Sequence, residues 1–411
     1  MKERVLLAIV TLDHRSEWTP EDVAHEMEEL IKTSGAKVVS AVFCKAIPPT
    51  APTLIGSGKV QEIASLCGNG DIDTVVFSCD LKGSQQRNLE EEFKVKTIDR
   101  TQLILDIFAR NARSNEGKMQ VELAQLEYLL PRLVGQSTEL SRLGGGIGTV
   151  GPGETKLEVD RRRIADRVAK LKKDLKSIVL SRQVKRKKRQ ENQVPLVSLV
   201  GYTNAGKSTL LNALTDAGQR THDGLFTTLD SLSRQFILPN HMKVVFSDTV
   251  GFMHDLPHHL IVSFKATLEE VSQADLLLHV LDVSHPNFLN LYSSVNEVLK
   301  ELDVLDKPTI IVLNKIDRLT DRNLLETFQR NFDDPVCISA LHKENLNELI
   351  ERIQEQLSED MVEIDVQLPL TRMDLVNLAH RQGTVHSVEY LPDFIHLQVL
   401  LPAKIAGQFR F

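Results

Sequence analysis

The run Gly201-Tyr202-Thr203-Asn204-Ala205-Gly206-Lys207-Ser208 constrains the fold of this chain more than any other feature. It fits the pattern G-x-x-x-x-G-K-[ST] and lies between an apolar strand-like run and a helix-like run, as a phosphate-binding loop requires. Its glycines let backbone N–H groups wrap phosphates at a helix N-terminus. We expect Lys207 to neutralise phosphate charge and the Ser208 hydroxyl to bind Mg²⁺. The sequence therefore predicts a nucleotide site in a doubly wound α/β domain.

Three further motifs follow in order, each after a strand-like run. Asp248-Thr249-Val250-Gly251 supplies an acid for Mg²⁺ and a glycine N–H that can sense the γ-phosphate. In Asn314-Lys315-Ile316-Asp317, the last carboxylate can accept two hydrogen bonds from guanine, whereas adenine would leave it unpaired. Ser339-Ala340-Leu341 can offer backbone N–H groups to the guanine O6. Together the four motifs predict a switch domain for GTP and GDP.

A fifth segment lies between the first two motifs and carries two adjacent threonines, Thr227 and Thr228. Either hydroxyl could complete the Mg²⁺ shell and order this loop when the γ-phosphate is present. Residue chemistry alone does not choose between them. The expected nucleotide contacts are Gly201, Tyr202, Thr203, Asn204, Ala205, Gly206, Lys207, Ser208, Thr209, Phe226, Thr227, Thr228, Leu229, Asp230, Asp248, Thr249, Val250, Gly251, Asn314, Lys315, Ile316, Asp317, Ser339, Ala340 and Leu341.

Two positions bear on the rate of hydrolysis. Ras-type enzymes place a glutamine after the D-x-x-G glycine to orient the attacking water, but here Phe252 and Met253 follow Gly251. We therefore expect slow intrinsic hydrolysis that depends on an outside activator. Asn204 matches the G-x-x-N-x-G-K-S form of potassium-stimulated GTPases, so K⁺ is a candidate cofactor. The alternative is that asparagine only tolerates a tight turn.

The phosphate loop belongs to the third of four segments that the sequence indicates. Residues 1–112 alternate strand-like and helix-like runs, which predicts a small α/β domain. Residues 113–193 predict a long helical hairpin, whose tip carries six glycines between residues 144 and 153. Residues 194–358 hold all four nucleotide motifs. Residues 359–411 predict a small α+β domain with two strands around a helix at 373–382.

The returning helix of the hairpin is strongly basic. Residues 161–190 contain fourteen Lys or Arg and two Asp, which is a local charge of +12. Because the net charge of the whole chain is −7, the remaining residues together carry −19. Such an arm suits a polyanionic partner, although a solvated helix face is the simpler interpretation. The apolar residues of this helix repeat as a heptad seam, typical of a helix packed along another. They are Leu157, Ile164, Val168, Leu171, Leu175 and Ile178.

Composition narrows the class of protein. Apolar residues make up 42 % and charged residues 26 %, which is ordinary for a globular chain. No apolar run is long enough to span a membrane, and the N-terminus has no signal-peptide pattern. The four cysteines are scattered without a Cys-x-x-Cys pair. We therefore expect a cytoplasmic protein without a disulfide framework.

Runs outside the nucleotide motifs resemble the HflX family of bacterial GTPases. They are IDRT (98–101) with LDIF (105–108), QVELAQL (120–126), LSRLGGGIG (140–148) and GPGETKLEVDRRR (151–163). The resemblance spans residues 1 to about 360 and implies a GTPase that associates with the large (50S) ribosomal subunit. It implies that the glycine-rich tip reaches towards the peptidyl-transferase centre while the basic arm lies on rRNA.

The resemblance also assigns roles within the site. The family switch motif is F-[AT]-T-L-D, which implies that Thr228 is the Mg²⁺ ligand together with Ser208 and Asp248. Lys207 and Thr228 are then the residues expected to act in catalysis. Ribosome splitting, rescue, recycling or biogenesis under stress is the implied role of a protein expected to be monomeric. Alternatives are an RNA-remodelling ATPase that binds ATP through the N-terminal domain, and a tRNA-modification GTPase. The lack of a catalytic C-terminal Cys disfavours the latter.

Overall fold

The computed structural model describes residues 2–11, 18–46, 52–133, 156–191, 194–215, 225–226, 232–254, 270–319, 321, 323–358 and 361–409. The predicted site residues Thr227, Thr228, Leu229 and Asp230 lie outside this part of the chain, as does the glycine-rich tip at 144–153. The chain divides into two compact units. Unit 1 contains Met1–Ile178, His222–Asp230 and Leu256–Phe264; unit 2 contains Val179–Thr221, Ser231–Asp255 and Lys265–Phe411. The predicted four-segment division is finer and stays a prediction.

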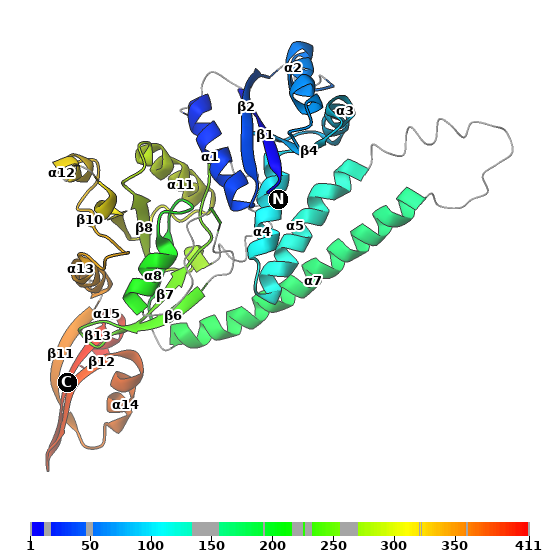
Figure 1. The fold of residues 1–411 in the computed structure, drawn as a ribbon. Coiled ribbons are helices and arrows are strands. Elements are labelled where there is room, and N and C mark those ends of the chain that lie inside the picture. Colours follow the sequence, from blue (N-terminus) through cyan, green and yellow to red (C-terminus); the bar gives the residue numbers. More distant parts are fainter. Residues whose placement is uncertain are drawn as a thin grey trace. The chain divides into compact units, whose positions relative to one another are not determined.

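Unit 1 is built around a parallel four-stranded sheet in the order β2-β1-β3-β4 (Figure 1). Its strands are β1 (Arg4–Thr11), β2 (Lys37–Lys45), β3 (Thr74–Phe77) and β4 (Lys96–Ile98). Its helices are α1 (Pro20–Thr33), α2 (Ser57–Gly68), α3 (Gly83–Phe93) and α4 (Arg100–Asn111). Helix α1 packs with α4, and α2 packs with α3. Because helices cover both faces, residues 5–10 of β1 are buried without alternation.

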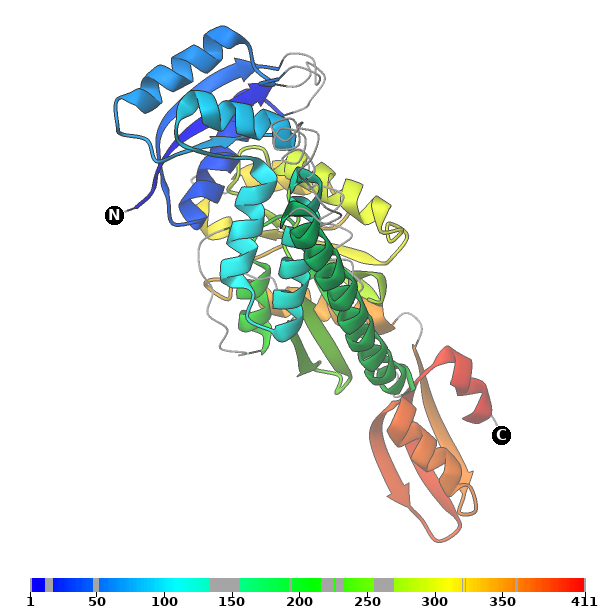
Figure 2. The same cartoon turned by 90° about the vertical axis from the view of Figure 1, so that its right-hand side faces the viewer.

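Two long helices follow the sheet of unit 1, and residues 179–191 of the second belong to unit 2. Helix α5 (Asn115–Leu133) continues two residues past Pro131, and α7 (Lys156–Glu191) runs back along it (Figures 1 and 2). Ion pairs join them, from Glu122 to Arg167 at 2.6 Å and from Glu127 to Lys172 at 2.8 Å. The five seam positions with described side chains are buried or half-buried, and Leu171 is 1 % exposed. This pattern supports the predicted hairpin.

Unit 2 contains a six-stranded sheet in the order β10-β9-β8-β5-β7-β6. The parallel strands are β5 (Leu196–Val200), β7 (Lys243–Asp248), β8 (Leu276–Asp282), β9 (Thr309–Asn314) and β10 (Val336–Cys337). The apolar runs of the sequence at 197–200, 244–246, 276–282, 309–313 and 336–338 predict these buried strands, and the structure has a strand at each. The edge strand β6 (Leu232–Ile237) is antiparallel to β7. The helices are α8 (Lys207–Thr215), α11 (Phe288–Glu301), α12 (Asn323–Gln329) and α13 (Leu346–Ser358).

The C-terminal part of unit 2 is an antiparallel sheet in the order β11-β13-β12. Its strands are β11 (Met361–Pro369), β12 (Thr384–Tyr390) and β13 (Phe394–Pro402), and α14 (Met373–Gln382) packs on them. The helix has the predicted bounds, but three strands are present where two were predicted. In the described part of the chain, every helix is too short or too polar to cross a bilayer.

Candidate nucleotide-binding site

The phosphate loop connects the end of β5 to the start of α8, and its backbone requires glycine at two places. Gly201 and Gly206 have φ values of +149° and +97°, in the range that side chains disfavour. A Cβ at Gly201 would collide with the Val280 carbonyl, and one at Gly206 with the Asn314 amide. The loop is therefore held against β8 and β9, with the N-terminus of α8 directed at the place where phosphates bind.

Lys207 is buried within this loop at the first position of α8. Its ammonium group donates hydrogen bonds to the carbonyls of Gly201, at 3.0 Å, and Tyr202, at 2.8 Å. Burial lowers the pKa of Lys207 to about 8, although the nearby Asp248 carboxylate opposes the shift. Among the described residues, the hydrogen-bond partners of this cation are carbonyl oxygens. A bound phosphate would supply the opposite charge that these carbonyls lack.

Ser208 and Asp248 form the predicted Mg²⁺ position. The Ser208 hydroxyl donates to Asp248 Oδ2 at 2.6 Å. Asp248 is fully buried at the end of β7, which pairs with β5 so that Leu199 lies beside it. A hydroxyl and a carboxylate are the hard oxygen donors that Mg²⁺ prefers, so these two residues fit the ion. When bound, Mg²⁺ supplies charge neutralisation at the β- and γ-phosphates.

Asn314 links the phosphate loop to the base-binding loops. Its Nδ2 donates to the Ala205 carbonyl at 2.8 Å, and its Oδ1 accepts from the Ala340 backbone N–H at 3.0 Å. The side chain is 2 % exposed. Lys315, the next residue, has φ +66° and pairs with Asp282 at 2.6 Å. Asn314 therefore holds two loops of the site together.

Asp317 is held in place for recognition of the base. The buried Ser339 hydroxyl donates to Asp317 Oδ1 at 2.5 Å, and the Asp317 side chain is 16 % exposed. Ile316 is buried in an apolar cluster with Leu313 and Cys337, whereas Leu341 is 65 % exposed. Asp317 is thus positioned by its neighbours before any base arrives. Ile316 anchors the loop in the core.

The D-x-x-G segment lies directly on the phosphate loop. Phe252 accepts from the Thr203 N–H at 2.8 Å through its carbonyl and donates to the Gly201 carbonyl at 3.1 Å through its N–H. A Cβ at Gly251 would come within 2.6 Å of Thr203 Cα, so glycine is required for this approach. The Phe252 side chain is 2 % exposed. A buried phenyl ring cannot orient water, which agrees with the expectation of slow intrinsic hydrolysis.

Tyr202 makes a contact that sequence reasoning missed. Its hydroxyl accepts a hydrogen bond at 2.9 Å from the backbone N–H of His254, three residues beyond the D-x-x-G glycine. The Tyr202 side chain is itself buried. Tyr202 occupies a variable position of the loop pattern, so its identity carried no signal. It adds a side-chain tie to the two backbone hydrogen bonds of Phe252.

The structure gives further detail on two predicted site residues, Asn204 and Phe226. Asn204 is exposed and has φ +62°, the left-handed conformation that asparagine tolerates, which supports the turn interpretation. Binding of K⁺ by Asn204 stays a hypothesis. Phe226 belongs to unit 1, where its ring packs edge-to-face on Phe108 with centroids 4.6 Å apart. Its carbonyl accepts from Asn111 Nδ2 at 2.8 Å. The structure therefore anchors Phe226 through apolar packing.

Family models match most of the chain. The model described as GTP-binding GTPase N-terminal matches residues 21–109, and the one described as GTP-binding GTPase Middle Region matches residues 111–189. A third, described as 50S ribosome-binding GTPase, matches residues 196–315. The third match contains the motifs from Gly201 to Lys315. The first two cover strands β2, β3 and β4 of unit 1 and most of the helical hairpin.

Individual relatives extend this similarity to the whole length. The GTPase HflX of Caldanaerobacter subterraneus subsp. tengcongensis is 43 % identical over 412 residues, covering 100 % of this chain and 93 % of the relative. The GTPase HflX of Escherichia coli K12 is 41 % identical over 345 residues, covering 84 % and 81 %. A solved GTP-binding protein from Sulfolobus solfataricus, in complex with GDP, is 27 % identical with a TM-score of 0.44, covering 87 % of this chain and 99 % of that one.

Proposed function

The chain belongs to the HflX family of GTPases, and on this premise we propose that its GTP-bound form docks on the large ribosomal subunit and that hydrolysis releases it. One observation carries the proposal: residues 196–315 match the model of a 50S ribosome-binding GTPase, and these residues include the phosphate loop, Asp248 and Asn314 of the site described above. Like other GTPases of this family, the protein binds GTP and hydrolyses it to GDP and phosphate.

Different residues of the site have different roles in GTP hydrolysis. Lys207 meets the β- and γ-phosphates, and Ser208 with Asp248 would hold Mg²⁺. We assign the remaining protein ligand to Thr228, as the family motif implies. The attacking water has no glutamine to orient it, because Phe252 fills that position and is buried. We therefore propose that the ribosome supplies the missing activation, and K⁺ near Asn204 is a second candidate activator.

The basic helix α7 is the surface that we assign to rRNA. Arg161, Lys170 and Lys173 are exposed on it. Guanidinium and ammonium groups along such a helix meet backbone phosphates without reading sequence, which gives affinity that falls steeply with salt. The same assignment places the protein in the cytoplasm, where ribosomes work. Ribosome splitting or rescue under stress is the role we favour, with subunit biogenesis as the alternative.

Co-sedimentation with purified 50S subunits tests the proposal. The full chain is mixed with subunits and either GDP or a non-hydrolysable GTP analogue, then centrifuged through sucrose. We expect pelleting with the GTP analogue and little with GDP. Deletion of residues 144–153 should reduce pelleting without changing the affinity for GDP. Equal pelleting with both nucleotides, or none with either, would contradict ribosome docking while leaving the GTPase assignment intact.

A matched pair of variants tests the role of α7. Arg161→Gln, Lys170→Gln and Lys173→Gln together remove three positive charges from the helix. Lys37→Gln, Lys94→Gln and Lys118→Gln remove the same charge from exposed positions elsewhere in unit 1. We expect the α7 variant to bind 50S subunits at least about tenfold more weakly at moderate salt. Equal weakening in both variants would show that only net charge matters.

A further inference from the structure

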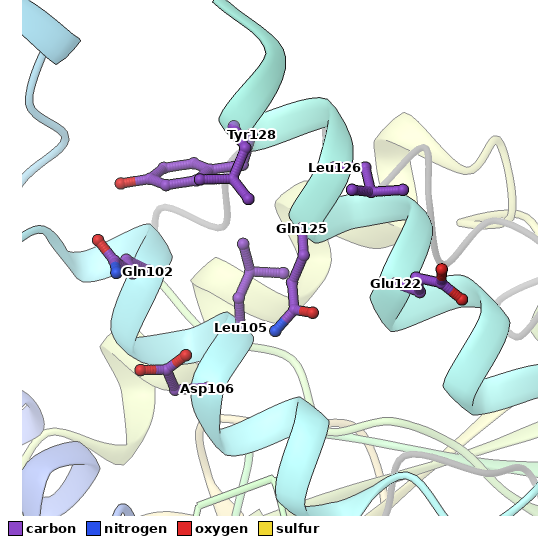
Figure 3. A pocket seen from close by; sticks show the side chains of 8 residues that line it. Gln102, Leu105, Asp106, Glu122, Gln125, Leu126 and Tyr128 are labelled. Carbon is purple, nitrogen blue, oxygen red and sulfur yellow. The ribbon is translucent and has the colours of Figure 1, made fainter. Parts of the chain in front are cut away.

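Unit 1 holds a pocket that the GTPase activity leaves unexplained. It lies between α4 and α5 (Figure 3) and has a volume of about 260 Å³. Helix α4 contributes Gln102, Leu105 and Asp106 to its walls, and α5 contributes Glu122, Gln125 and Leu126. All of these except Gln102 belong to the runs 98–101 with 105–108 and 120–126, which carry the family resemblance outside the nucleotide motifs. The two segments therefore converge on one feature.

Asp106 is the unsatisfied group of this pocket. Its carboxylate is half-buried, and burial raises the pKa of Asp106, although Lys96 and Arg110 oppose the shift from a distance. Among the described residues, none donates a hydrogen bond to it or forms an ion pair with it. The Gln125 side chain reaches from α5 towards α4 at the same place (Figure 3), and the described residues give its amide no partner either.

Four cations lie near this pocket, and in the described part of the chain none forms an ion pair with Asp106. Lys96 and Arg110 act on Asp106 only through their charge, and the Arg110 guanidinium donates to the Ser34 carbonyl. Arg167 pairs with Glu122 through two hydrogen bonds of 2.6 Å. Arg132 pairs with Asp99 at 2.9 Å, and its guanidinium lies 3.4 Å from the centre of the Tyr128 ring. A half-buried carboxylate without a partner costs free energy that a bound cation would recover. Asp106 is thus open to a cation from outside the described chain.

We propose that the pocket between α4 and α5 binds an alkylguanidinium group, the side chain of an arginine on a partner polypeptide, with Asp106 as its counter-ion. A planar guanidinium carries five donors, enough to serve the Asp106 carboxylate and the oxygens of Gln102 and Gln125 together. The alkyl stem lies along Leu105, Leu126 and Leu129, of which Leu129 is 44 % exposed at the mouth. A nucleotide is disfavoured because the walls carry two carboxylates.

Ligand-observed NMR on the full chain tests the proposal with four probes. They are N-acetylarginine amide, its uncharged isostere N-acetylcitrulline amide, N-acetyllysine amide and agmatine. We expect saturable binding of the arginine probe with a Kd of about 1 mM or tighter, and no saturation with the citrulline probe. Agmatine bound more tightly than the arginine probe would identify a free amine as the natural occupant. Equal binding of arginine and citrulline probes overturns the proposal.

Variants locate the site. Asp106→Asn removes the counter-ion and should lower the affinity for the arginine probe at least about tenfold. Glu91→Gln removes an exposed acid on α3 and should leave that affinity unchanged. Leu129→Trp, at an exposed position that tolerates a larger side chain, should block the mouth with a similar loss. Affinity for GDP should stay unchanged in all three variants. A loss of arginine binding at this pocket can therefore be distinguished from a loss of nucleotide binding at the GTPase site. Binding by Asp106→Asn and Leu129→Trp at the level of the unaltered chain overturns the proposal.

Discussion

The side-chain amide of Asn314 donates to the carbonyl of Ala205 at 2.8 Å, so the strand that leads to the base-binding loop is tied to the phosphate loop. The other end of the same amide accepts from the Ala340 N–H. Three of the four nucleotide motifs thus share one buried side chain. This residue organises both halves of the site, and the base itself is left to Asp317.

Asn314→Ala should lower the affinities for GDP and GTP to a similar extent. The substitution leaves the Ala205 carbonyl and the Ala340 N–H without their side-chain partner, at a cost of about 1–3 kcal/mol for each buried group. We expect the affinities for GDP and GTP to fall by about tenfold to a thousandfold while guanine stays preferred over adenine. Titration with fluorescent GDP, GTP and ATP analogues measures this. A selective loss of guanine preference would show that Asn314 reads the base directly.

Asp317→Asn should change which base is accepted. Asp317 is fixed by Ser339 and offers only acceptors, which suits the N–H donors of guanine. An amide in its place presents a donor, which suits the 2-oxo group of xanthine. We expect GDP affinity to fall by about two orders of magnitude or more and XDP affinity to rise. Competition between XDP and fluorescent GDP checks the exchange, and unchanged GDP affinity would contradict the assignment.

Tyr202→Phe should loosen the D-x-x-G segment without unfolding the domain. It removes only the hydroxyl that accepts from the His254 N–H at 2.9 Å, worth about 1 kcal/mol. We expect GDP release to become several-fold faster in stopped-flow measurements. Tyr390→Phe, at a position 61 % exposed on β12, is the matched control. The same release rate in Tyr202→Phe and the control would show that the backbone hydrogen bonds of Phe252 hold the segment alone.

The nucleotide motifs and the parallel strands of unit 2 could be predicted from sequence because each depends on short, local patterns. Buried parallel strands are apolar throughout, and the loop chemistry follows them at fixed spacing. The edge strand β6 was not predicted, because Leu232–Ile237 is mostly exposed and pairs on one side only. The three-residue strand β4 is too short to produce a pattern.

Contacts between segments that are distant in the chain could not be predicted from the sequence. The tie from Tyr202 to His254 depends on how the chain returns after β7, and the pocket at Asp106 depends on how α5 packs against α4. Phe226 shows the same limit: its packing on Phe108 joins segments far apart in the chain, and its predicted nucleotide contact stays a prediction. The type of a residue does not show which distant residue its side chain contacts, because that depends on how the helices and strands pack.

Nucleotide binding should take up a proton in alkaline solution. Burial lowers the pKa of Lys207 to about 8 in the free protein, and bound phosphate raises it again. Below pH 8 the lysine is already charged, so affinity stays flat; above pH 8 affinity falls by up to about tenfold per pH unit. Above pH 8, calorimetry in buffers of different ionisation enthalpy should detect proton uptake on GDP binding that rises with pH towards one proton per GDP. Zero uptake would contradict the buried state of Lys207.

Acid should destabilise unit 2 through His279. This residue is 1 % exposed on β8 and stacks on Tyr292 at 5.0 Å, and burial lowers its pKa to about 3. The unfolded chain binds this proton near pH 6.5, so the stability contributed by neutral His279 is fully present above that pH. It is lost as pH falls from about 6.5 towards 3, by up to about 1.4 kcal/mol per pH unit.

His279→Phe keeps the stack on Tyr292 and removes the titration. Urea unfolding at a series of pH values should therefore give a flatter decline in the free energy of unfolding between pH 6.5 and 4 for the variant than for the unaltered chain. His386→Phe, at an exposed position of β12, controls for the loss of one histidine and should leave the slope unchanged. Parallel curves for the unaltered chain and His279→Phe would mean that the acid sensitivity arises from the carboxylates instead.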